Sequence, residues 1–138
     1  MHIVGHGIDL VSIERIGRLL SEHQERFLER CFTAHEQMYF SDVRNAPGHA
    51  AARFAAKEAV LKALGTGLTG GIQWTDIEVR RDAMGKPGIL LRGKAAEVAD
   101  SLGITGWHVS LTHADGFASA SVIAVGEGTS HGPADDAS

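Results

Sequence analysis

The chain has 138 residues, an apolar share of 43% and a formal net charge of −4, which fit one globular domain with its own core. This mildly acidic balance argues against nucleic acid as a partner, because nucleic-acid binders need a basic surface. Cys31 is the single cysteine, so no intrachain disulfide can form and a reducing, cytoplasmic location is expected. Neither a signal peptide nor an apolar stretch of the roughly 20 residues that a membrane span needs is predicted.

The first predicted element is a strand over residues 2–11, in which Gly5 and Gly7 interrupt β-forming residues. Glycine inside a strand indicates a bend or the close approach of another backbone. Asp9 lies between two apolar residues, and the alternation of a strand turns its side chain to the opposite face. A carboxylate in an apolar strand needs a partner, although an aspartate that caps the end of the strand fits the same pattern.

A helix is expected next, capped by Ser12 and running to about Arg30. A second, short helix should reach about Ser41, because Thr33 and Glu36 have the spacing of a capping box. Arginines and glutamates alternate beside the apolar stripe of the first helix, which is typical of a solvated, mixed-charge face.

The third predicted helix, from about His49 to Leu64, carries charges in unusual places. Lys57 falls inside the apolar sector, where a lysine is rarely found, and Glu58 falls at the rim of that sector. Lys62 follows Glu58 by four residues, so the two side chains can meet. An ordinary surface ion pair has the same spacing, and the pattern alone does not make a site.

After a glycine-rich link, two hairpins are expected with a short helix between them. The predicted elements are strands at about 73–81 and 88–92, a helix at about 94–102, and strands at about 107–112 and 117–125. His113 follows one of these strands, where a surface histidine is the simpler interpretation. The order of elements predicts an α+β fold, with a mainly antiparallel sheet packed against helices, in a single domain over residues 1–125. Residues 126–138 are polar and acidic, which predicts a disordered tail.

Asp9 and Glu58 together suggest a metal site. Two carboxylates are a minimal site for Mg²⁺, which completes its shell with water and phosphate oxygens. Lysine and histidine side chains nearby, such as Lys62 and His113, suit those phosphates. The sequence shows neither a zinc-binding pattern nor a recognisable serine–histidine–aspartate triad. The residues alone therefore indicate Mg²⁺-dependent chemistry on a phosphate ester.

Two long segments resemble the motifs of the 4′-phosphopantetheinyl transferases. The first is Gly-Ile-Asp-Leu-Val-Ser-Ile-Glu-Arg-Ile at 7–16, and the second is Arg-Phe-Ala-Ala-Lys-Glu-Ala-Val-Leu-Lys-Ala-Leu-Gly-Thr-Gly at 53–67. Residues 85–87 and 109–113 resemble two further segments of this family. Length and motif order resemble the small, single-domain holo-[acyl-carrier-protein] synthase branch, and the resemblance runs from about residue 5 to residue 125.

The resemblance implies a 4′-phosphopantetheinyl transferase-like fold and a role in fatty acid biosynthesis and lipid metabolism. The implied reaction moves the phosphopantetheine arm of coenzyme A to a serine of apo acyl carrier protein and releases adenosine 3′,5′-bisphosphate. Asp9, Glu58 and Lys62 are the implied catalytic residues. Asp9 and Glu58 would hold Mg²⁺, Glu58 or a metal-bound water that it orients would accept the serine proton, and Lys62 would stabilise the leaving bisphosphate.

The resemblance further implies a homotrimer whose sites lie between subunits, with Lys86, Pro87 and His113 supplied by the neighbour of the subunit that supplies the catalytic residues. The residues expected to bind coenzyme A are Arg53, Lys57, Lys62, Gly65, Thr66, Lys86, Pro87 and His113. Arg15, Arg18 and Arg26 are expected to dock the acidic carrier protein, although glutamates share their helix where the family's helix is basic.

Two other classes of function fit parts of this pattern. One is a non-catalytic module that binds coenzyme A or a nucleotide, and the other is a Mg²⁺-dependent hydrolase of a small phosphoester. Asp9, Glu58 and Lys62 all occur inside the two long motifs. A non-catalytic relative would be free to lose one of them, so their joint presence favours the transferase.

Overall fold

The structure is a computed structural model, and it describes residues 1–129. Its elements are β1 (His2–Ser12), α1 (Ile13–Glu22), α2 (Gln24–Cys31), α3 (Ala34–Ser41), α4 (Ala46–Leu64), the 3₁₀ helix η1 (Trp74–Asp76), β2 (Ile77–Arg81), β3 (Pro87–Leu91), α5 (Gly93–Ser101), β4 (Ile104–Ala114) and β5 (Phe117–Gly126). The predicted order of elements is confirmed.

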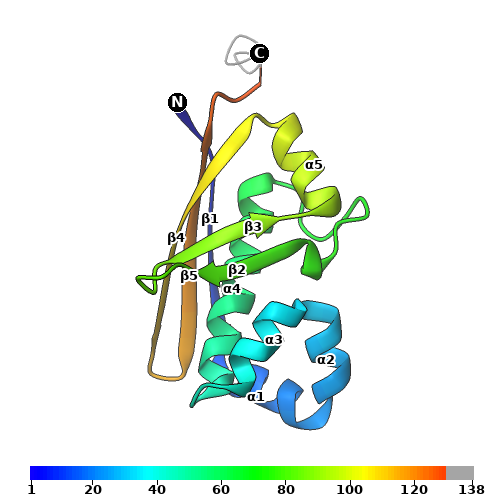
Figure 1. Ribbon diagram of the computed structural model, residues 1–138, viewed down its shortest axis with the longest axis vertical. Helices are drawn as coiled ribbons and strands as arrows, with labels where there is room; N and C mark the ends of the chain where they lie inside the picture. The colour runs from blue at the N-terminus through cyan, green and yellow to red at the C-terminus, as the bar shows by residue number, and fades with distance from the viewer. Residues whose placement is uncertain (130–138) are drawn as a thin grey trace.

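Two antiparallel sheets organise the fold. The larger has the strand order β1–β5–β4, and the smaller is the β2–β3 hairpin. In Figure 1 the described helices lie to one side of the larger sheet. Ile8 and Leu10 project from the other face of β1 and are 58% and 65% exposed. This mixed helix and antiparallel sheet architecture confirms the predicted α+β class and leaves an apolar strip on the uncovered face.

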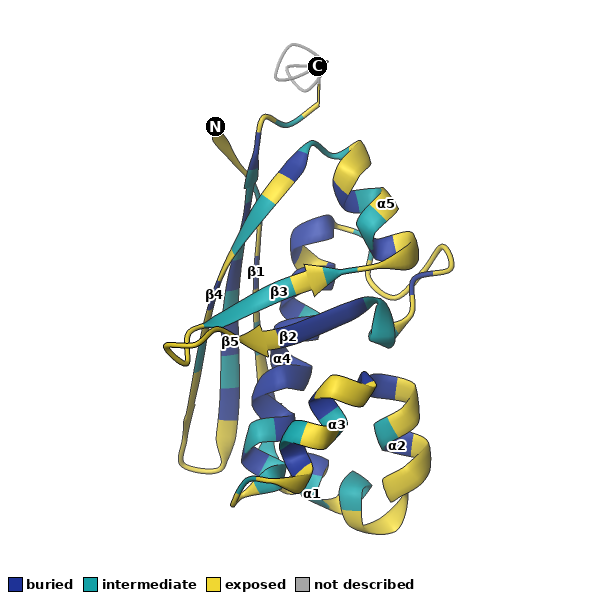
Figure 2. Cartoon of the chain, in the orientation of Figure 1, coloured by how far each residue is buried: buried dark blue, intermediate teal, exposed yellow. Residues whose placement is uncertain are grey.

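Helix α4 forms the centre of the core, and Figure 2 shows it buried along most of its length. The helix packs against β1 at close range, because Gly5 and Gly7 have no side chains. A Cβ atom at Gly7 would lie 1.9 Å from the carbonyl oxygen of Ala59, and one at Gly5 would lie 2.2 Å from that of Ala63. The close backbone approach that these strand glycines predict is therefore confirmed.

Although α4 is 19 residues long, no helix within residues 1–129 is both long and apolar enough to cross a membrane. Helix α4 begins at Ala46 rather than near His49, because Asn45 adopts a left-handed conformation and its side chain caps Gly48. Pro47 then occupies the first turn, where its missing N–H leaves no bond unmade.

The single helix expected up to about Arg30 is wrong in one respect, since it is broken at His23. This residue leaves the helical conformation (φ −137°, ψ 38°) and separates α1 from α2. The break allows Phe27 to pack edge-on against Phe32, with ring centroids 5.5 Å apart, and to contact Phe54 at 6.1 Å. Aromatic packing of this kind is a long-range contact that the helical pattern does not contain.

Other boundaries also differ from the prediction, and β4 begins at Ile104 rather than near Trp107 and includes His113. Residues 74–76 form η1 instead of the start of a strand. Gly126 closes β5, and Gly128 donates its N–H to the carbonyl of Gly103 at 3.3 Å, so the first residues of the predicted tail continue the domain. The rest of that tail, 130–138, lies outside the described residues.

Candidate active site

Asp9 projects from β1 toward α4, as the strand alternation predicts. Its carboxylate accepts a hydrogen bond from Lys62 Nζ at 3.1 Å, and the same ammonium group donates to the carbonyl of Ile8 at 2.9 Å. The side chain of Asp9 is only 16% exposed, whereas that of Lys62 is 54% exposed. Lys62 therefore forms its ion pair across the β1–α4 interface, and not along the helix with Glu58 as the four-residue spacing suggested.

Glu58 lies beside this pair and is left without a hydrogen bond or an ion pair among the described residues. Burial, and next the charge of Asp9, raise the pKa of the Glu58 carboxyl, and the charges of Lys62 and Arg15 offset this only in part. Within residues 1–129 no group of three or more histidine, cysteine, aspartate or glutamate side chains could hold a metal. A pair of carboxylates fits Mg²⁺, which takes its remaining oxygens from water and substrate phosphates.

A second group of side chains gathers around Tyr39 of α3. The guanidinium carbon of Arg53 lies 4.1 Å from the centre of the Tyr39 ring, and the ring of His49 contacts the same tyrosine at 5.5 Å. Arg53 is 2% exposed, and its Nε and Nη1 atoms have no hydrogen-bond partner among the described residues. An unpaired buried cation is costly, and burial lowers the pKa of Arg53. The site is therefore suited to an anion.

Arg81, at the end of β2, and His113, near the end of β4, face this group. Burial, and then the positive charges of Arg53, Arg81 and His113, lower the pKa of His49, so each of these three side chains lies within electrostatic reach of His49. His113 is paired with Ala118, whose side chain is fully buried, so His113 is on the helix-covered face of the sheet.

Lys86 lies in the turn between β2 and β3, and Pro87 is the first residue of β3. Together with Arg80 and Arg81 they line a shallow depression of about 400 Å³. Arg81 thus lines the depression and also acts on His49. The residues His49, Arg81 and Tyr39 were missed by the sequence reasoning; the only local signal was that His49 precedes Arg53 by one helical turn.

The two groups lie on opposite flanks of α4. Arg53 and Lys62 are nine residues apart, which at about 100° per residue places them on opposite sides of the helix. In the larger sheet, Asp9 is on the edge strand β1 and His113 is on the other edge strand, β4. With β5 between them, the edge strands are about 10 Å apart. We call these groups the carboxylate half-site (Asp9, Glu58, Lys62) and the cationic half-site (His49, Arg53, Arg81, His113).

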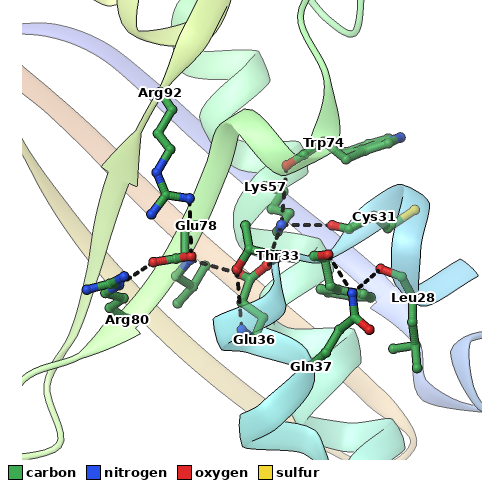
Figure 3. A network of polar contacts seen from close by, with 12 residues as sticks. Leu28, Cys31, Thr33, Glu36, Gln37, Lys57, Trp74, Glu78, Arg80 and Arg92 are labelled. Carbon is green, nitrogen blue, oxygen red and sulfur yellow. Dashed lines mark hydrogen bonds and ion pairs between the residues drawn. The ribbon is translucent and has the colours of Figure 1, made fainter.

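Lys57 belongs to neither half-site, which corrects the expectation that it faces coenzyme A. Its ammonium group is fully buried, lies 2.6 Å from Glu36 Oε1, and donates to the carbonyls of Cys31 at 2.8 Å and Trp74 at 3.2 Å (Figure 3). A lysine has three N–H donors, and all three are used. The other carboxylate oxygen of Glu36 accepts the N–H of Val79 at 2.8 Å, which ties α3, α4 and β2 together.

Gly65 ends α4 in the left-handed conformation that the sequence predicts, with φ of 79°. Its N–H and that of Thr66 both donate to the carbonyl of Leu61, at 3.0 and 3.3 Å. The two amides therefore close the helix, and the Thr66 hydroxyl donates to Gly67 at 2.8 Å. Of the two residues expected to contact coenzyme A here, only the Thr66 side chain can turn outward without opening the cap.

The three arginines expected to dock a carrier protein are split by the helix break. Arg15 and Arg18 are on α1, where Arg18 pairs with Glu14 at 3.8 Å, and Arg26 is on α2. Arg26 lines a groove of about 260 Å³ between α2 and η1, together with Leu19, His23, Phe27, Arg30, Cys31 and Trp74. The groove combines apolar walls with two guanidinium groups.

Comparison with known proteins identifies the fold and its family. The family model of the 4′-phosphopantetheinyl transferase superfamily matches residues 5–118. The holo-[acyl-carrier-protein] synthase of Koribacter versatilis is 46% identical over 121 residues, which cover 88% of this chain and 97% of that protein. The crystal structure of the synthase from Neisseria meningitidis superposes with a TM-score of 0.81 at 34% identity, and covers 90% of this chain and 99% of the other.

The Helicobacter pylori synthase, solved in complex with coenzyme A, superposes with a TM-score of 0.76 at 31% identity, over 87% of this chain and 99% of that one. Its match extends the likeness to a ligand-bound member of the family. The matches cover almost the whole length of these relatives, so the similarity includes the strands and helices that carry both half-sites. The chain therefore belongs to the 4′-phosphopantetheinyl transferase superfamily, as an enzyme of its holo-[acyl-carrier-protein] synthase branch.

Proposed function

We propose that this enzyme transfers the 4′-phosphopantetheine arm of coenzyme A to a serine of apo acyl carrier protein in the cytoplasm, with Mg²⁺ bound, and releases adenosine 3′,5′-bisphosphate. The observation that carries the proposal is the carboxylate half-site, where a free carboxylate, Glu58, lies beside the Asp9–Lys62 ion pair. The family membership and the coenzyme A complex of a relative support the same reaction.

Asp9 and Glu58 would hold the metal. When bound there, Mg²⁺ would neutralise the pyrophosphate of coenzyme A and orient its oxygens. The serine oxygen would bond to the β-phosphorus while the bond from that phosphorus to the bridging oxygen breaks, which releases the bisphosphate. The protein contributes mainly position and charge to such a reaction.

Glu58, or a metal-bound water that it orients, is the proposed acceptor of the serine proton. The pKa of Glu58 is raised by burial and by Asp9, which brings the carboxylate closer to the operating pH that favours a general base. Lys62 keeps its ammonium group half exposed while bonded to Asp9, so it can stabilise the charge that develops on the leaving bisphosphate.

A complete site would combine the carboxylate half-site of one subunit with the cationic half-site of its neighbour, in a homotrimer. Because the two half-sites lie on opposite flanks of α4, a head-to-tail contact between copies can join them, and such contacts close into rings. The exposed Ile8 and Leu10 supply apolar surface for this association. His113, Lys86 and Pro87 would then bind the adenosine end of coenzyme A, together with Arg53, while Thr66 would lie near the pyrophosphate.

The carrier protein would dock beside the carboxylate half-site. Arg15 is close enough to Glu58 to lower its pKa, so a carrier held by Arg15 and Arg18 would present its serine near the metal. Arg26 and the groove between α2 and η1 extend this surface. An acidic carrier with apolar side chains at its contact face complements this combination of guanidinium groups and apolar walls.

Mass spectrometry of the intact carrier protein tests the reaction. Apo acyl carrier protein is incubated with the enzyme, coenzyme A and Mg²⁺, beside a Glu58→Ala variant and a metal-free sample. The expected result is a carrier that gains one phosphopantetheine arm with wild-type enzyme only. Coenzyme A binding without any gain on several apo carriers would instead support a non-catalytic binding module.

Mixed trimers test whether sites are shared. Asp9→Asn damages only the carboxylate half-site and Arg53→Met only the cationic one, so each variant alone should have little activity at coenzyme A concentrations near the wild-type dissociation constant. In trimers reassembled from equal amounts of both, about one site in four should combine two intact half-sites, and about a quarter of the wild-type activity should return. No recovery, with trimers intact by light scattering, would show that one chain supplies the whole site.

A further inference from the structure

We propose that His49 joins Arg53, Arg81 and His113 in binding the 3′-phosphate of coenzyme A, and that its imidazole takes up a proton when this phosphate arrives. The inference rests on the proposed function, and adds to it a residue that sets specificity and links ligand binding to pH. None of the family motifs identified in the sequence contains His49.

The position of His49 follows from the helix and from one aromatic contact. His49 and Arg53 are one turn apart on α4, so they lie on the same flank of the helix. Both contact Tyr39, whose ring is 5.5 Å from that of His49 and 4.1 Å from the Arg53 guanidinium carbon. His49 is half-buried, and so it can reach a ligand that also reaches Arg53.

The charges around His49 indicate the kind of ligand. Its neighbours with charge or a titratable group are Tyr39 from α3, Arg53 from α4, Arg81 from β2 and His113 from β4. Within residues 1–129, no carboxylate is among the groups that shift the pKa of His49. Arg53 is buried with Nε and Nη1 unbonded among the described residues. A phosphomonoester, with its two negative charges and three acceptor oxygens, would satisfy these donors together.

The direction of the pH effect follows from the same geometry. In the free enzyme, burial and the surrounding cations keep the pKa of His49 below its ordinary value, so the ring is mostly neutral near pH 7. A phosphate placed among the four side chains favours the protonated ring and raises this pKa. Because the complex then binds more protons than the free enzyme, its affinity for the phosphate should rise as pH falls through the interval between the two pKa values.

Calorimetric titration of the full-length enzyme tests this, with coenzyme A and with dephospho-coenzyme A, which lacks the 3′-phosphate. His49→Gln should weaken coenzyme A binding roughly tenfold at pH about 6 and less than about twofold at pH about 8. Dephospho-coenzyme A binding should be unchanged at both pH values. Titrations in buffers of different ionisation enthalpy should also show that wild type takes up more protons than the variant.

Two further variants separate charge from packing. His49→Phe keeps a ring against Tyr39 but cannot be protonated, so it should behave like His49→Gln. His35→Gln removes an exposed histidine of α3, the helix that carries Tyr39, and should behave like wild type. Thermal unfolding of each variant confirms that the fold is kept.

Several results would overturn the inference. The inference is wrong if His49→Gln loses the same affinity for coenzyme A at both pH values, or if it loses the same affinity for both ligands. It is also wrong if His49→Phe binds both ligands like wild type. If wild type modifies the carrier protein and His49→Gln binds coenzyme A equally well at pH about 6, only the role of His49 fails. If wild type binds neither ligand and transfers nothing, the proposed function fails as well.

Discussion

Arg53 and Lys57 are two buried cations one turn apart on α4, and they differ in their hydrogen bonds. Lys57 has a partner for each of its donors, including Glu36 at 2.6 Å. Arg53 has two nitrogen atoms without a hydrogen-bond partner within the described part of the chain. A buried cation whose hydrogen-bond donors all have protein partners contributes to the fold, whereas one with unpaired donors can bind a ligand. Burial alone therefore does not distinguish a structural charge from a binding one.

The surroundings of the two cations also differ. Glu36 bonds Lys57 and the N–H of Val79, and the neighbouring Glu78 forms ion pairs with Arg80 and Arg92 (Figure 3). Positive and negative groups are thus matched around Lys57. Arg53 lies against Tyr39 and near the cation Arg81, and Glu36 acts on its charge without a hydrogen bond to it. A negative partner bonded directly to Arg53 would therefore have to come from a ligand.

The largest predicted effect is the loss of stability when Lys57, the structural cation, is replaced. Lys57→Met should destabilise the enzyme by about 3–5 kcal/mol, because it leaves Glu36 buried without its counter-charge. Urea unfolding followed by circular dichroism measures this change. The double variant Lys57→Met/Glu36→Gln removes both charges and should recover part of the loss. If the double variant is no more stable than Lys57→Met, the ion pair is not what holds α3 to α4.

The second prediction concerns the binding cation. Arg53→Met should weaken coenzyme A binding by roughly 10- to 100-fold, since hydrogen bonds to charged groups are worth about 1.5–3 kcal/mol. Its free energy of unfolding should stay within about 1 kcal/mol of wild type, because no protein bond to Nε or Nη1 is lost. Calorimetry and urea unfolding measure the two quantities. A large loss of stability with unchanged affinity would reverse the contrast with Lys57.

A third prediction extends the comparison to the carboxylate half-site, where Asp9 and Glu58 lie beside the exposed cation Lys62. Mg²⁺ at ten times its dissociation constant should stabilise wild type by about 1.4 kcal/mol if Asp9 and Glu58 hold it. Chelation should remove this gain, and Asp9→Asn should show none. The melting temperature, recorded with and without Mg²⁺, measures it. Equal stabilisation of wild type and Asp9→Asn would place the ion elsewhere.

The smallest effect is expected from the pH dependence of stability at His49. The pKa of His49 is lower in the folded enzyme than in the unfolded chain. Its contribution to the free energy of unfolding is therefore present above the pKa of the unfolded chain, and it is lost as pH falls through the pKa of the folded enzyme. His49→Gln should therefore be less sensitive to acid, by about 0.5 kcal/mol or less. Unfolding at pH about 8 and about 5 tests this, and a variant that is more acid-sensitive than wild type would contradict it.

Much of this enzyme is determined by local sequence. Glycines at positions 5 and 7 predict the close approach of α4, strand alternation predicts the face of Asp9, and Thr33 with Glu36 forms the predicted capping box. These features depend on neighbouring residues and on the periods of strand and helix, which the sequence displays directly. The motifs that resemble the family are also contiguous, so the family was identified correctly.

Only the tertiary structure decided which side chains meet. It paired Lys62 with Asp9 instead of Glu58, paired Lys57 with Glu36, and brought His113 near His49. Each of these partners is more than 20 residues away along the chain. Helical periodicity shows which face a residue occupies, but the element that packs on this face is set by the core as a whole. For this reason the sequence placed Arg53 and Lys57 together as ligand-binding cations, and the fold separated their roles.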